Sequence, residues 1–113
     1  MVRQSFDRQL ADLQDEVIVL GNMVDRAIDQ SIEALRNLDR EHARRIIEDD
    51  KLINRKRFDI EEMCLHLIAR QQPLASDLRI IAAILSIIID LERMGDHAQG
   101  IAKPGLQLCF DPV

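Results

Sequence analysis

The strongest constraint on the fold is an unbroken seven-residue spacing in the first third of the chain. Between Ser5 and Leu38, apolar and small residues recur in alternating steps of four and three, without a slip. A strict repeat of this kind is typical of long, slightly supercoiled helices that pack side by side. The positions that follow it are Phe6, Leu10, Leu13, Val17, Leu20, Val24, Ala27, Ser31, Ala34 and Leu38.

Two further segments show the same spacing. Asp39 suits the N-cap of a second helix, which runs to about residue 70 and ends before Pro73. A third helix is expected over 74–103, stopped by Pro104-Gly105. The expected inward positions are Ala43, Ile46, Asp50, Ile53, Arg57, Ile60, Cys64 and Leu67, then Leu74, Leu78, Ile81, Leu85, Ile88, Glu92 and Gly95.

These patterns predict an all-α protein, an up-down-up three-helix bundle with tight loops. The composition agrees, because 47% of the residues are hydrophobic but neither Trp nor Tyr occurs. We expect one domain over residues 1–105 and an irregular C-terminal tail over 106–113, where apolar residues show no periodicity.

Charge and hydropathy exclude several classes of protein. The formal net charge of −5 argues against a general nucleic-acid binder. The longest apolar run, 80–89, is far shorter than the roughly 20 residues that span a bilayer. No signal peptide is visible, and the two cysteines, Cys64 and Cys109, are too few for a disulfide framework. We therefore expect a cytoplasmic protein with no membrane insertion.

The hydrophobic residues exceed what one three-helix core needs. The third helix is apolar almost all round between Ile80 and Ile89, and the first carries Ile18, Ile28 and Leu35 away from its inward face. A second apolar face predicts a partner, and we expect a homodimer that pairs two bundles into a six-helix array.

Two acids interrupt the inward positions. Glu92 and Asp50 stand where apolar residues are expected, and each has a polar residue one turn later, Asp96 and Asn54. Residues four apart project from the same helix face. A carboxylate on a buried face costs several kcal/mol unless it is paired, protonated or bound to a cation.

The two polar pairs are expected to meet across the second and third helices. Antiparallel helices have equal rise, so residues equidistant from the turn near Pro73 lie at the same height. Asn54 and Glu92 are each 19 residues from Pro73, and Asp50 and Asp96 are each 23.

Three carboxylates and one amide oxygen favour a hard or adaptable cation: magnesium, manganese, iron or zinc. The alternative is that Arg57 neutralises Glu61 or Glu92, with no metal bound. Asp25 and Asp29 of the first helix lie near the same level and could be outer ligands, but we interpret them, like His97, as solvated surface residues. No Ser/His/Asp set, phosphate-cradling glycine loop or Glu-x-x-His pair occurs, so the sequence does not predict an enzyme.

Several segments together resemble the PhoU family of phosphate-signalling proteins. They are Phe6-Asp7, IIEDDKLIN at 46–54, IARQQPLASDLR at 68–79 and DLERMGD at 90–96. The last two are the most specific. The resemblance covers nearly the whole chain, but only one three-helix repeat is present where the family typically has two.

The resemblance implies a non-enzymatic negative regulator of the phosphate-starvation response. The family is thought to couple a phosphate ABC transporter, through its ATPase subunit, to a sensor histidine kinase. It also implies metal binding by paired acid motifs, here Glu92 with Asp96 and Asp50 with the less acidic Asn54. Asp77 and Arg79 match the family's third-helix start and are candidate partner contacts, although Asp77 equally suits a first-turn acid favoured by the helix dipole.

Overall fold

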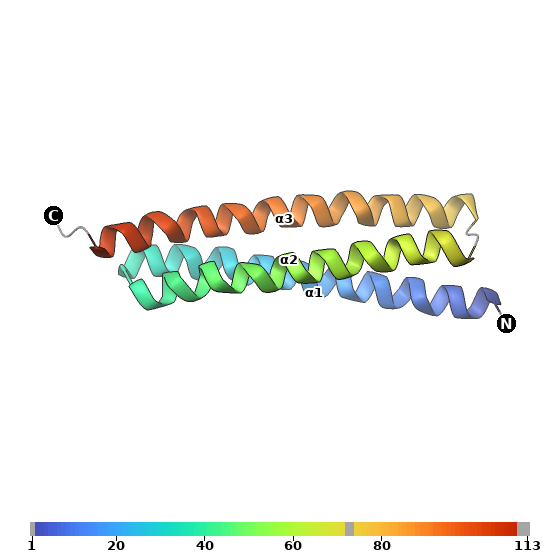
Figure 1. The fold of residues 1–113 in the computed structure, drawn as a ribbon, viewed down its shortest axis with the longest axis horizontal. Helices are drawn as coiled ribbons and strands as arrows, with labels where there is room; N and C mark the ends of the chain where they lie inside the picture. The colour runs from blue at the N-terminus through green and yellow to red at the C-terminus, as the bar shows by residue number, and fades with distance from the viewer. Residues whose placement is uncertain (1, 72–73, 111–113) are drawn as a thin grey trace.

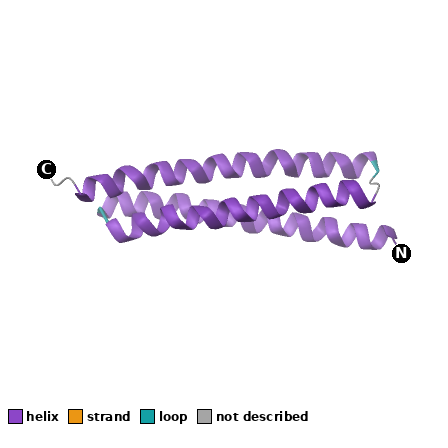
Figure 2. Ribbon diagram, viewed as in Figure 1, coloured by secondary structure: helices purple, strands orange, loops and turns teal. Residues whose placement is uncertain are grey.

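A computed structural model shows three helices, each antiparallel to the next along the chain, that form a rod of 64 × 18 × 16 Å (Figure 1). The described residues are 2–71 and 74–110, with side chains described for 3–69 and 74–103. Helix α1 spans Val2–Asn37, α2 spans Arg40–Gln71 and α3 spans Ala75–Phe110. Each helix packs against the other two, and no strand occurs in the described part of the chain (Figure 2). The predicted all-α, up-down-up bundle is confirmed.

The turn between α1 and α2 is closed by backbone bonds. Leu38 has a left-handed φ of 49° and donates its N–H to the carbonyl of Leu35, at 3.3 Å. Asp39 donates to the carbonyl of Ala34 at 3.0 Å, which completes a Schellman-type helix end. The Asp39 carboxylate then accepts the N–H of His42 at 3.0 Å, so its predicted role as the N-cap of α2 is confirmed. Leu38 itself is exposed because it has left the helix.

The core follows the predicted inward positions of α1 and α2. Most of these positions are buried and the others, apart from Leu38, are partly buried. Near the α1–α2 turn the core consists of small residues, Ala34, Ala43 and Ala102, packed with Ile46. Along the rest of the rod it is built from larger residues: Phe6, Leu10, Leu13, Leu20, Val24, Ile53, Ile60, Cys64, Leu67, Ile81, Ile84 and Ile88.

The inward face of α3 was predicted only in part. Ile81, Ile88 and Gly95 are buried as expected, whereas Leu74 and Leu78 are exposed. A heptad repeat allows inward positions spaced by three and then four residues, or by four and then three. In α3 both orders of spacing place apolar side chains at most inward positions. Packing against α1 and α2 selects the other order: Asp77, Ile84 and Leu91 turn inward where Leu78, Leu85 and Glu92 were expected.

The predicted end of the third helix and the irregular tail are wrong. The backbone stays helical through Pro104 and on to Phe110, while 111–113 lie outside the described residues. A proline in a helix removes one N–H donor and crowds the carbonyl four residues earlier. Here that carbonyl belongs to Gly100, which is exposed and has open space beside it, so water can replace the lost donor.

Over residues 2–71 and 74–110, no helix has a stretch apolar enough to cross a membrane. Cys64 is a free, buried thiol. Burial, with a smaller effect from the nearby Glu61 charge, raises the pKa of that thiol to about 11. Cys64 therefore stays protonated and acts as a small apolar core residue at neutral pH.

Candidate metal centre

The close approach of α2 and α3 is centred on Gly95. A β-carbon placed on Gly95 would lie 3.6 Å from Oδ1 of Asp50 and 3.4 Å from Cγ2 of Ile53. Gly95 is buried although it has no side chain, and Asp50 is only 6% exposed. The backbone of α3 at Gly95 therefore packs directly beside the Asp50 carboxylate, at a distance where a β-carbon would make ordinary van der Waals contact.

Asn54 is paired with Asp50 along the same face of α2. Its Nδ2 donates to Oδ2 of Asp50 at 3.3 Å. This bond leaves Oδ1 of Asp50 and Oδ1 of Asn54 buried, with no hydrogen-bond partner among the described residues. Two unpaired buried acceptors cost free energy unless a donor or a cation reaches them. The predicted pairing on α2 therefore has two oxygens available to a ligand.

The carboxylates of α3 lie close enough to act on Asp50. Burial raises the pKa of the Asp50 carboxyl above its ordinary value, and the charges of Asp96 and Glu92 raise it further. The Asn54 hydrogen bond and the charge of Lys103 act in the opposite direction. The residues that the equal-height argument matched thus lie near enough for the charges of Asp96 and Glu92 to act on Asp50. An added cation there would favour the ionised form of Asp50.

Glu92 has a partner of its own. Its Oε2 lies 2.9 Å from Nε of Arg57 on α2, while Nη1 of Arg57 lies 2.5 Å from Oε2 of Glu61. The Nε–H of Arg57 is not aligned for a hydrogen bond with Glu92, so that contact is an ion pair. The neutralising role considered for Arg57 is therefore present in the geometry. Metal coordination by Glu92 would have to displace Arg57.

The arrangement fits a cation only in part. Among the side chains of residues 3–69 and 74–103, no three His, Cys, Asp or Glu residues are grouped closely enough to hold a metal ion. Asp96 is exposed and Glu92 is turned to Arg57. The chemistry of the donors nevertheless suits a hard cation, because Asp50 and Asn54 both offer unpaired oxygens.

Asp77, in the first turn of α3, is buried against the rest of the bundle. Its Oδ2 accepts from Nη1 of Arg3 at 2.6 Å and from the N–H of Leu74 at 3.1 Å, and its Oδ1 accepts from Nη2 of Arg3 at 3.1 Å. The Arg3 hydrogen bonds hold the pKa of Asp77 below its ordinary value. These contacts favour the first-turn interpretation of Asp77. Arg79 is exposed, and its proposed contact with a partner stays a prediction.

Sequence reasoning missed the ion pair of Arg3 with Asp77. The sequence spacing contained a signal for this pair. Arg3 lies 36 residues before Asp39, and Pro73 lies 34 residues after Asp39. Equal rise along α1 and α2 therefore brings Arg3 to the level of the second turn, where α3 begins. A second missed pair, Lys56 with Glu16 at 2.6 Å, joins α2 to α1.

The fold and the acidic site define a class of protein, a three-helix bundle with carboxylates on one interhelical face. The sequence of this chain matches the family model of the PhoU domain over residues 17–104. The crystal structure of PhoU from Pseudomonas aeruginosa superposes with a TM-score of 0.89 at 36% identity, over 95% of this chain and 51% of that one. The PhoU regulatory protein of Streptococcus pneumoniae gives 0.85 at 43%, over 91% and 49%.

A curated relative gives the same picture. The chain is 38% identical to the phosphate-specific transport system accessory protein PhoU of Escherichia coli K12, over 90% of this chain and 42% of that protein. The chain belongs to the PhoU family and spans about half the length of the curated relatives it matches. These relatives are named as an accessory protein and a regulatory protein of phosphate transport.

Proposed function

We propose that this chain is a metal-binding regulator of phosphate uptake. It acts in the cytoplasm, restrains the phosphate-starvation response, and links the ATPase subunit of a phosphate ABC transporter to a sensor histidine kinase. Its membership of the PhoU family supports the regulatory role, because relatives are named as accessory proteins of phosphate-specific transport.

The observation that carries the metal-binding part is the pair of unpaired buried oxygens on α2, one of which, Oδ1 of Asp50, lies beside Gly95. Oδ1 of Asp50 and Oδ1 of Asn54 are shielded from solvent, and the charge of Asp96 acts on Asp50 from α3. In the proposed site, Asp50, Asn54, Asp96 and Glu92 supply the oxygen ligands. Iron, zinc, manganese and magnesium all accept such ligands, and a bound ion would offset the repulsion among the carboxylates.

Metal content tests this proposal directly. Protein stripped with a chelator, then exposed to Mn²⁺, Fe²⁺, Zn²⁺ or Mg²⁺ and desalted, is expected to retain metal. The double substitution Glu92→Ala with Asp96→Ala should remove at least about nine-tenths of it, because losing such ligands weakens a site by tenfold or more. Elemental analysis gives the metal content, and circular dichroism confirms the fold.

The matched control is Asp25→Ala with Asp29→Ala. These two exposed acids have the same four-residue spacing on α1, so they report non-specific loss of charge. Equal metal content in wild type and both double variants would refute metal binding at this site. The regulatory part is checked with the same proteins by measuring a phosphate-starvation reporter in cells that lack their own regulator and have ample phosphate.

The alternative function is a helical interaction module whose inward acids are ion-paired and bind no metal. The contacts of Arg57 with Glu92 and Glu61 favour it. The two functions differ in the metal assay, since a module held by ion pairs retains no more metal than the Glu92, Asp96 double variant.

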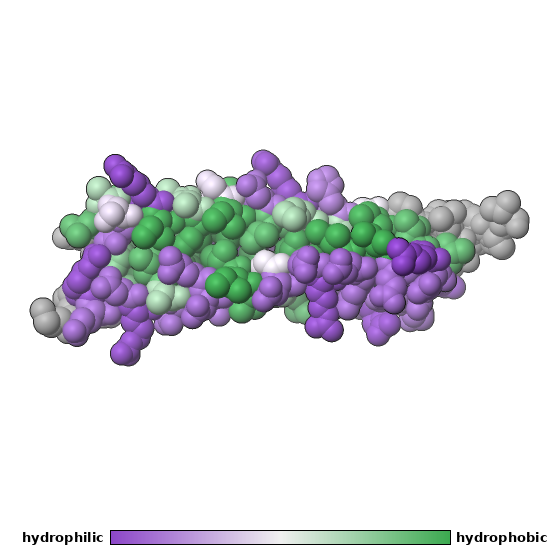
Figure 3. All heavy atoms as spheres, turned by 180° about the vertical axis from the view of Figure 1, so that it is seen from behind, coloured by the Kyte–Doolittle hydropathy of each residue, from purple (hydrophilic) through white to green (hydrophobic). Residues whose placement is uncertain are grey.

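We also propose that a second copy of the chain covers its apolar face and so forms a six-helix array. Figure 3 shows a hydrophobic band along the rod on the side opposite to the view of Figure 1. Large apolar side chains of α1 and α3 are exposed: Ile18, Val19, Ile32, Leu78, Ile80, Ile87, Ile89 and Met94. An apolar surface of such length favours an obligate contact over a solvated face.

Mass in solution checks the pairing. Light scattering is expected to give twice the chain mass of 13.0 kDa for the wild type and the chain mass for Ile87→Glu, because a buried charge disrupts an apolar interface. Arg93→Glu, an exposed site on the same helix, serves as the control and should stay dimeric. A monomeric wild type at all concentrations would contradict the proposal.

A further inference from the structure

A groove between α1 and α2 lies outside the acidic site. It has a volume of about 540 Å³ and lies toward the α1–α2 turn. Its apolar lining includes Met23 and Ala27 of α1 and Ile46 of α2. Ala27 is small and half-buried, so the groove deepens where a larger side chain would fill the space between the helices. The volume is in the range of small-molecule sites.

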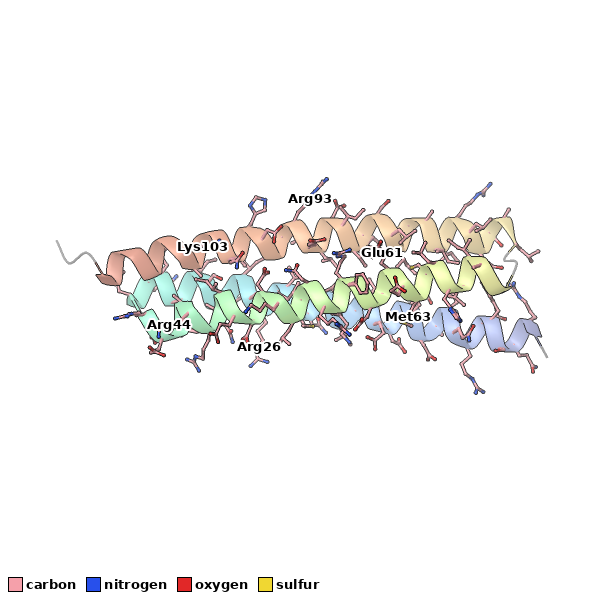
Figure 4. The ribbon with its side chains drawn as sticks, in the orientation of Figure 1. Arg26, Arg44, Glu61, Met63, Arg93 and Lys103 are labelled. Carbon is pink, nitrogen blue, oxygen red and sulfur yellow. The ribbon has the colours of Figure 1, made fainter. Side chains whose placement is uncertain are left out.

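The polar lining of this groove includes two arginines. Arg26 and Gln30 contribute from α1, and His42 and Arg45 contribute from α2. Neither Arg26 nor Arg45 makes an ion pair or a side-chain hydrogen bond with any described residue. Figure 4 shows the labelled Arg26 directed away from α3. The two guanidinium groups are thus available to a ligand in a chain with an excess of acids.

The geometry points to a phosphorylated small molecule of about mononucleotide size as the ligand of this groove. Guanidinium groups bind phosphate oxygens through charge-assisted hydrogen bonds. Arg26 and Arg45 come from different helices, so they approach an anion from two directions. A tetrahedral phosphate presents three terminal oxygens to such a pair, whereas a carboxylate presents two oxygens in one plane.

The remaining lining residues favour an ester over free phosphate. Met23, Ala27 and Ile46 offer an apolar surface on which a ring can lie. Asp49 also lines the groove and repels a second anionic group, but its carboxylate can accept a hydrogen bond from a hydroxyl or amino group. A phosphate bound by the two arginines, joined to a sugar or base that offers a hydroxyl or amino group to Asp49, satisfies both the cationic and the acidic residues.

The size of the groove disfavours an acidic protein as the occupant. A stable protein–protein contact is broad, typically about 800 Å² on each partner. This groove holds about 540 Å³ and is lined by residues of α1 and α2, with both arginines among them. Small ligands bury most of their surface in sites of this size. The proposed site is independent of the metal site and of the regulatory role proposed above.

Calorimetric titration of the full chain with AMP, in EDTA to exclude metal bridging, tests the proposal. We expect saturable binding to one site per chain. Arg26→Gln and Arg45→Gln should each weaken it about tenfold or more, because each removes charge-assisted hydrogen bonds to the phosphate. Arg8→Gln, at an exposed arginine outside the groove, is the matched control and should bind like the wild type.

Parallel titrations with inorganic phosphate, adenosine, citrate and a glutamate-rich peptide distinguish the ligand classes. Weaker binding of each than of AMP supports the inference. It would be overturned by binding of AMP that is equal in all variants, by no binding of AMP, or by inorganic phosphate, citrate or the peptide binding at least as tightly. Retained helical circular dichroism in the glutamine variants ensures that lost binding reflects the groove.

Discussion

Replacing Leu67 by alanine is expected to lower the free energy of unfolding by about 2–5 kcal/mol. Leu67 is 3% exposed and belongs to the main core between the helices. The truncation removes buried methyl groups and leaves a cavity that the long helices cannot close without moving their backbones. Urea unfolding followed by circular dichroism, at a fixed chain concentration, measures the change.

Leu65→Ala is the matched control, with the same chemical change two residues away on α2. Leu65 is 49% exposed, and its truncation should cost less than about 1 kcal/mol. Equal losses for the two variants would contradict the assignment of inner and outer faces on this helix. A large loss at Leu65 alone would indicate that another molecule covers that face in solution.

Replacing Asp50 by asparagine is expected to have opposite effects with and without metal. In chelator at neutral pH, Asp50→Asn should raise the free energy of unfolding, because it removes a buried charge that Asp96 and Glu92 repel. With metal at a hundredfold excess over its dissociation constant, the wild type should gain about 2.7 kcal/mol. The variant should gain almost nothing, since it has lost the charged ligand at the centre of the site.

Denaturant unfolding in EDTA and in the metal that the elemental assay identifies gives the four free energies required. Asp29→Asn, an exposed acid on α1, controls for the loss of one negative charge. An equal metal-dependent gain in wild type and Asp50→Asn would exclude Asp50 as a ligand. A lower metal-free stability of Asp50→Asn would show that the ionised carboxylate is favourably paired and not repelled.

Much of the candidate site could be predicted from spacing alone. Asp50 and Glu92 stood out because an acid replaced an apolar residue in a repeat, and equal helical rise then matched them with Asp96 and Asn54. What spacing could not give was the direction of each side chain. Glu92 turns to Arg57, because α3 packs with Leu91 inward and leaves Glu92 at the edge of the core.

The groove residues Arg26 and Arg45 could not have been selected from the sequence, since exposed arginines on long helices usually lie next to acids and pair with them. Whether such a pair forms depends on rotamers and on the neighbouring helix. The same limit applies to Arg3 and Asp77, which are 74 residues apart and meet only because three helices align.

By itself, the sequence determined three long helices, their up-down-up order and which acids of α3 lie near Asp50. Those features depend on local periodicity, on turn residues such as Asp39 and on the constant rise of a helix. Only the tertiary structure decided which of two heptad orders α3 adopts, that its backbone passes Pro104, and which oxygens remain unpaired. These three features depend on packing against the other helices or on solvent access. The spacing of residues within one segment encodes neither packing nor solvent access.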